Sequence, residues 1–451
     1  MVGNSRIGIA WSDLPRELVE MIANCLHTEI DVLRFRAVCS SWRSSTTPFK
    51  KFPCTPLKLP FFPFQAGETS FIIHQGAYFS LTERTVYRLQ LPEITEPRSW
   101  LVKIEKSEDG KLRILNPVSD NQIKILPETQ LPKLLNTLDF RICEVRKAYT
   151  LQYINPAKPK KKYDYKRVKK VAVSGDVKNN KYVIMAIADF DKLWYIKSGD
   201  EKWTMVRDNC GSNNFLDVVN YKGQFYGIDF RGGTWVFDSM FESTKITYNI
   251  CCPASKAHLV DLYEEELFLV EEIRVRKCYD IDGCQSRSPR TPVATLTMEI
   301  RVSKIDKGLR EWVEAKTVDN QIIFLGDDCS FSVFAEEFEG YKGTRVFYTD
   351  RDICFHTEEK KLHFHDNDDY YDDNWDYGYN YIECDCNFSS DNDAGTIDNF
   401  VPSDEVKLKF RGLHGHNTGV CDFASGKSGS LLMYPEYADI FWPPPSWLSR
   451  S

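Results

Sequence analysis

Residues 11–48 read WSDLPRELVEMIANCLHTEIDVLRFRAVCSSWRSSTTP, and this stretch decides how the chain begins. Apolar residues recur every four positions at Leu14, Leu18, Ile22 and Leu26, which predicts an amphipathic helix. Two further short helical patterns follow before residue 48. A segment this short buries too little surface to be stable alone, so we expect its apolar faces to need a partner.

Start signals accompany these helices. Ser12 or Asp13 is expected to cap the first helix, and Pro15 suits its first turn, where no hydrogen-bond donor is missed. Thr28 and Asp31 are expected to cap the second helix. On pattern alone, an ordinary helical hairpin packed on the rest of the chain is the favoured interpretation, because amphipathic helices are usually core elements.

The order of these residues resembles the F-box. The Leu14-Pro15 opening, the Val38-Cys39 pair and the Trp42-Arg43 pair all stand at the family spacing, within an expected module of residues 9–50. The resemblance implies docking on a Skp-type adaptor, and through it on a cullin-based ubiquitin ligase. It also implies that one set of residues divides between the core of the module and the adaptor contact: Leu14, Pro15, Leu18, Ile22, Leu33, Val38, Cys39 and Trp42.

Within that set, two groups are the best candidates for the contact itself. They are Leu14-Pro15 and the face that runs from Val38 to Trp42. Apolar and aromatic anchors of this kind usually dominate protein–protein interfaces. The sequence does not sort the eight residues one by one.

Composition limits the class of protein. The chain has 451 residues, a net charge of −7 and 42% hydrophobic residues, which fits one small module and one large body. The acidic balance argues against general nucleic-acid binding, and no apolar run is long enough to predict a membrane span. No secretory signal is read, so the 14 cysteines are expected to be reduced thiols in the nucleus, the cytoplasm or both.

The sequence pattern changes from helical to β after an expected linker at residues 51–60. Short alternating runs such as Lys181–Ala186 and Glu266–Val270 are separated by turn residues, which predicts a mainly β body over residues 61–448. Two tryptophans, Trp203 and Trp312, each follow a charged turn 109 residues apart, and Tyr221-Lys-Gly is echoed 120 residues later by Tyr341-Lys-Gly. Two blades of about 50–60 residues would produce both intervals, so we expect a β-propeller of about six or seven blades. Coincidence between hairpins of an irregular all-β fold is the alternative.

A second resemblance concerns this body. Asn116-Pro-Val-Ser119, Phe324-Leu-Gly326 and the terminal Trp442-Pro-Pro-Pro-Ser-Trp447 are similar to signatures of plant F-box proteins with a KIB-type propeller. The resemblance implies a kelch-like propeller of unknown function behind the F-box. It implies a non-catalytic receptor subunit whose propeller recruits an unknown target protein for ubiquitination.

Two charged segments stand out. The basic loop 156–170 carries lysines that could act in nuclear import, although a solvated loop between strands fits equally well: Lys160, Lys161, Lys162, Lys169 and Lys170. The acidic segment 366–393 mixes aspartates with tyrosines and is expected to be an insertion without a core of its own.

No cofactor or metal is expected. His363-x-His365, Cys384-x-Cys386 and His414-x-His416 lie within one region, but they lack the spacing of a structural zinc site. No nucleophile elbow, phosphate-binding loop or dinucleotide fingerprint is present. The alternatives to a degradation receptor are a non-degradative F-box scaffold and, less favoured, a metal-dependent propeller enzyme.

Overall fold

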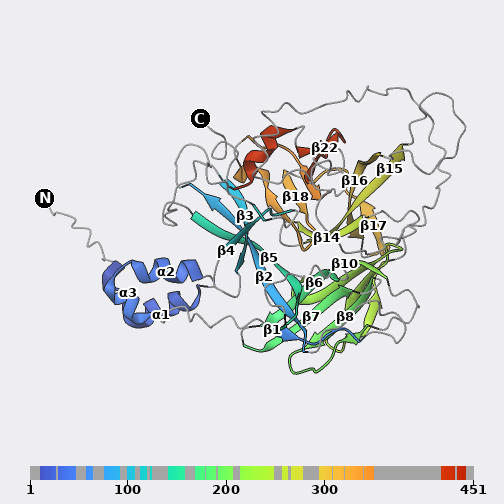
Figure 1. The fold of residues 1–451 in the computed structure, drawn as a ribbon. Coiled ribbons are helices and arrows are strands. Elements are labelled where there is room, and N and C mark those ends of the chain that lie inside the picture. The colour runs from blue at the N-terminus through green and yellow to red at the C-terminus, as the bar shows by residue number, and fades with distance from the viewer. Residues whose placement is uncertain are drawn as a thin grey trace, which may run out of the picture.

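The computed structural model describes five sheets and a separate group of short helices (Figure 1). The described residues are 11–26, 29–46, 57–63, 76–91, 99–106, 112–118, 122–123, 141–157, 168–177, 179–188, 191–206, 214–247, 256–262, 266–277, 294–306, 308–318, 320–338, 340–349, 418–431 and 434–442.

The helical module comes first and lies beside the sheets in Figure 1. It contains a 3-10 turn η1 (Trp11–Asp13) and the helices α1 (Arg16–Asn24), α2 (Glu29–Ala37) and α3 (Ser40–Ser45). In the described residues, no helix is long and apolar enough to cross a membrane.

Sheet A is assembled from strands that lie far apart in the sequence. Its strand β2 (Tyr78–Gln90) pairs on one edge with β5 (Arg141–Ile154), and on the other edge with β1 (Leu57–Leu59) and β3 (Ser99–Lys106). Strand β4 (Leu112–Leu115) completes this sheet by pairing with β3.

Three sheets that follow are simple antiparallel meanders in chain order. They are sheet B, with β6 (Val168–Asp176), β7 (Lys181–Ala188), β8 (Lys192–Lys197) and β9 (Thr204–Met205); sheet C, with β10 (Phe215–Tyr221), β11 (Gln224–Asp229), β12 (Thr234–Phe237) and β13 (Ser243–Lys245); and sheet D, with β14 (Lys256–Leu262), β15 (Glu266–Lys277), β16 (Ala294–Asp306) and β17 (Glu311–Glu314).

Sheet E departs from a meander. Its order is β19 (Ser330–Phe334), β18 (Gln321–Leu325), β20 (Arg345–Thr349), β21 (Thr418–Asp422) and β22 (Ser428–Ser430), and β18 and β20 run parallel. All five residues of β18 are buried because neighbours cover both faces of this central strand. Two 3-10 turns flank the sheet, η3 (Ala335–Glu337) and η8 (Pro435–Ile440).

Apolar clusters join the sheets into a ring. Phe79 and Leu151 of sheet A pack with Ile184 of sheet B, and further clusters join B to C, C to D and D to E. A last cluster brings Val86 and Leu101 of sheet A together with side chains of sheet E, so the ring closes. Closure covers the sheet faces that each blade exposes when it stands alone.

The described residues thus form five blades, and the expectation of six or seven is wrong for this part of the chain. The reason is that blades do not use equal lengths of sequence. Sheets A and E draw their strands from residues 57–154 and 321–430, far more chain than the 50–60 residues assumed for one blade.

Candidate adaptor-binding surface on the helical module

A small aromatic core holds the three helices together. Val19 of α1, Phe35 of α2 and Trp42 of α3 are buried against one another. The rings of Phe35 and Trp42 have centroids 4.3 Å apart, and the Trp42 indole donates a hydrogen bond of 3.1 Å to the carbonyl of Trp11. The apolar cluster contains only residues of the helical module, with Leu14, Ala23, Leu26 and Cys39 half-buried around it.

The caps of the helices differ from the expected ones. Helix α1 begins after Pro15, whose carbonyl accepts from Leu18 and Val19, and no side chain caps this end. The Ser12 hydroxyl instead donates to Asp13, so the prediction that either residue caps α1 is wrong. A proline suits this position because a helix start needs no donor there.

The capping residues of the other two helices also differ from expectation. Asp31 lies inside α2 and forms a long ion pair with Arg34, so it is not the cap expected, and Thr28 lies outside the described residues. Cys39 caps α3, where its sulfur accepts from the backbone N–H of Trp42 at 3.4 Å. A cysteine sulfur therefore occupies the capping position that a hydroxyl or carboxylate oxygen usually takes.

Reciprocal arginine contacts fix α2 against α3. The Arg36 guanidinium donates to the carbonyls of Arg43 and Thr46, and Arg43 donates back to the carbonyl of Arg36 at 3.1 Å. These bonds satisfy carbonyls at the ends of two short helices, which would otherwise lack partners. The Trp-Arg pair of the motif therefore stabilises the module itself.

Large apolar side chains remain outside this core. Leu18, Met21 and Ile22 are 45%, 65% and 40% exposed, and Met21 and Ile22 lie three and four positions after Leu18 on α1. Leu33 and Val38 are 58% and 56% exposed, and Trp11 is exposed as well. Half of the exposed large hydrophobics in the described part of the chain thus lie in this short module, and such concentrations mark interaction sites.

The structure sorts the eight residues that the sequence left together. Leu18, Ile22, Leu33 and Val38 are exposed side chains, Pro15 is an exposed helix cap, and Leu14 and Cys39 are half-buried. Trp42 is a core residue, so its place in the expected contact face needs correction. Val19 and Met21 are both apolar residues of α1, yet Val19 is buried and Met21 is exposed.

The basic loop is only partly described. Lys160, Lys161 and Lys162 lie outside the described residues, whereas Lys169 and Lys170 belong to β6. Lys170 is buried and its ammonium lies 3.3 Å from the Asp217 carboxylate, so an import receptor cannot reach it in the folded protein. The expectation that Lys170 serves import is corrected because the inner strands of sheets B and C enclose it.

The acidic segment 366–393 and the histidine and cysteine pairs at 363–365, 384–386 and 414–416 also lie outside the described residues. Within the described ranges, no group of three His, Cys, Asp or Glu side chains could hold a metal ion.

Comparison with known proteins agrees with this architecture. Residues 11–52 match the F-box domain, and residues 78–372 match the KIB1-4 beta-propeller family. An F-box followed by a propeller defines the class of this protein. The chain belongs to the KIB1-4 beta-propeller family, and specifically to its members that carry an F-box.

Two relatives from Arabidopsis thaliana match along nearly the whole chain. F-box protein SKIP23 is 25% identical, with 98% of this chain and 96% of the relative covered. F-box protein At2g17036 is 26% identical, with 98% and 95% covered. The similarity to these two plant F-box proteins therefore extends over both the helical module and the propeller of this chain.

Proposed function

We propose that this protein is the substrate-receptor subunit of a Skp–cullin–F-box ubiquitin ligase. One observation carries the proposal: the helical module fills its core with its own side chains and still exposes Leu18, Met21, Ile22, Leu33 and Val38. These residues fit a Skp-type adaptor, which would cover them and link the chain to a cullin.

The mechanism needs no catalytic group in the receptor. The propeller would bind a target protein while the module is held on the ligase, and tethering would make ubiquitin transfer to the target effectively intramolecular. Proximity of this kind raises the local concentration of the target without any new chemistry. The target itself is read by loops of the propeller, since loops on a rigid scaffold usually carry recognition.

The test is binding of the full chain to a purified Skp-type adaptor at micromolar concentration. Leu18→Asp/Ile22→Asp should abolish the binding, because two charges would then face the apolar contact. Leu112→Asp, at an exposed position of β4 in the propeller, is the matched control and should bind as the wild type does. Absence of wild-type binding, or equal binding by all three proteins, would contradict the proposal.

We also propose residence in the nucleus, the cytoplasm or both, with Lys160, Lys161, Lys162 and the part-exposed Lys169 as the import residues. The test changes Lys160, Lys161 and Lys162. A fluorescent fusion with these three lysines changed to alanine should lose nuclear signal relative to the wild type. An unchanged distribution would assign these lysines to a solvated loop.

A further inference from the structure

The seam between sheets A and E differs from the other four seams of the ring. Linkers 155–167, 206–214, 246–255 and 315–320 connect each sheet to the next along the chain. No such linker connects sheet E back to sheet A, so this seam depends on contacts between segments that are far apart in the sequence. Closing it also costs more chain entropy than closing a seam between successive sheets.

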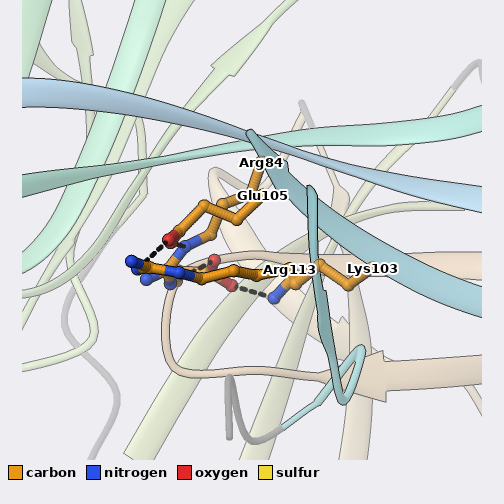
Figure 2. A network of polar contacts seen from close by, with 5 residues as sticks. Arg84, Lys103, Glu105 and Arg113 are labelled. Atoms are coloured by element: carbon orange, nitrogen blue, oxygen red, sulfur yellow. Dashed lines mark hydrogen bonds and ion pairs between the residues drawn. The ribbon is translucent and has the colours of Figure 1, made fainter. Parts of the chain in front are cut away.

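Buried ion pairs cross this seam (Figure 2). The Lys103 ammonium of β3 lies 2.6 Å from one Asp328 oxygen, and the Arg84 guanidinium of β2 lies 3.3 Å from the other. Asp328 belongs to the turn between β18 and β19 of sheet E, and the Lys103 side chain is fully buried. A buried lysine is tolerated only where a carboxylate compensates its charge.

The network extends within sheet A. Glu105 of β3 accepts from Arg84 at 2.9 Å and from Arg113 of β4 at 3.0 Å. Three cations of sheet A therefore share Glu105 and Asp328. Loss of the Asp328 charge would remove the carboxylate that pairs with Lys103 and Arg84 across the seam.

Two sequence signatures meet at the same place. A Cβ atom on Gly326 would lie 3.0 Å from the carbonyl oxygen of Val118 and 2.6 Å from that of Cys329, so sheet E approaches the Asn116-Pro-Val118 turn closely. The Asn116 side chain holds that turn by accepting from the N–H of Val118 at 2.8 Å. Nearby, the N–H of Trp442 donates to the carbonyl of Leu101 at 2.9 Å and joins the Phe441-Trp442 segment to sheet A.

We infer that the A–E seam is a charge-held closure of the propeller, with Asp328 as its central residue. The segments 116–118 and 324–330 serve this closure rather than contact with a target. The apolar cluster supplies non-directional attraction, whereas the buried charges fix which groups meet. Without the Asp328 charge, the ring opens at this seam before any of the four linked seams.

Native-state hydrogen exchange of the full chain tests the inference. Asp328→Asn should speed exchange in β3 and β18 by about a hundredfold or more, since it removes the charge of the carboxylate that lies 2.6 Å from the buried Lys103 ammonium. Exchange in β10 and β11 of sheet C should change far less. The matched control is Glu83→Gln, which removes an exposed partner of Lys147 within sheet A and should leave exchange at the seam unchanged.

The double variant Lys103→Met/Asp328→Asn distinguishes opening of the A–E seam from general destabilisation of the protein. Removing both partners also removes the buried Lys103 charge, so its seam should exchange more slowly than that of Asp328→Asn. Arg84 is part-exposed and keeps Glu105 in this variant. Equal acceleration in sheets A, C and E, or a double variant as unstable as the single one, would overturn the inference.

Discussion

Trp203 and Trp312 occupy equivalent places two blades apart. Trp203 precedes the outermost strand of sheet B, and its indole donates to the Pro60 carbonyl beside sheet A at 2.9 Å. Trp312 lies in the outermost strand of sheet D, and its indole donates to the Thr234 hydroxyl of sheet C at 2.9 Å. Each tryptophan therefore forms a hydrogen bond that links the outer edge of its blade to the preceding blade.

The two positions differ in burial, which predicts different costs of substitution. Trp203→Phe should lower the free energy of unfolding by about 2–3 kcal/mol, because it leaves a small void beside Phe62 and removes the Pro60 contact. Trp312→Phe, at a half-buried position, should cost about 1 kcal/mol. Urea unfolding of both variants measures the difference, and equal midpoints would contradict the difference in cost argued from burial.

Trp42→Ala should unfold the helical module without unfolding the propeller. The loss of a buried tryptophan costs about 3–5 kcal/mol, which a core of this size cannot absorb. Hydrogen exchange of peptides from α1 and α3 should become fast, whereas peptides from β7 should remain protected. Arg16→Ala, which breaks an exposed ion pair with Glu20, is the control and should change stability by under about 0.5 kcal/mol.

Gly326→Ala should destabilise the propeller by about 1–3 kcal/mol through overpacking. The added methyl group would meet the backbone carbonyls of Cys329 and Val118, which cannot move aside independently. Gly308→Ala is the matched control, because its methyl group would meet only a carboxylate oxygen of Asp306 at 3.3 Å. Thermal unfolding compares the two, and equal midpoints would show that the seam adapts to the extra group.

Burial raises the pKa of the Cys421 thiol to about 11, and the neighbouring Asp422 carboxylate acts in the same direction. At pH 8 the native thiolate fraction is then about one in a thousand, so iodoacetamide should label the exposed Cys25 well before Cys421. Mass spectrometry of labelled peptides measures both rates. Fast labelling of Cys421 in the native protein would show that β21 opens readily.

The same shift predicts a pH dependence of stability. The folded pKa lies above the ordinary value of 9.0, so the native state holds this proton more tightly than the unfolded state. The resulting stabilisation is complete below about pH 9 and is lost as pH rises through about 11. Relative to Cys421→Ala, the wild type should lose about 2–3 kcal/mol across this window, as measured by urea unfolding at each pH.

Local patterns in the chain were sufficient to predict the helical module, the mainly β body and the two-blade interval between Trp203 and Trp312. The first two features depend on residues close together in sequence, such as the four-residue recurrence from Leu14 to Leu26, and the third on a motif that recurs along the chain. The comparisons confirmed both family resemblances. The echo between Tyr221 and Tyr341 was less informative, because Tyr221 ends the innermost strand of sheet C whereas Tyr341 precedes the third strand of sheet E.

Other features arise from contacts between distant segments, which no local period encodes. The five-blade ring depends on sheets A and E, whose strands come from long ranges, and its closure joins Lys103 to Asp328. Trp42 and Leu18 are both apolar, yet only Trp42 is buried. Lys170 carries the same charge as the other lysines of the basic loop, yet it is buried between sheets. A residue's exposure is set by what packs over it, so only the folded chain could distinguish core residues from residues left for a partner.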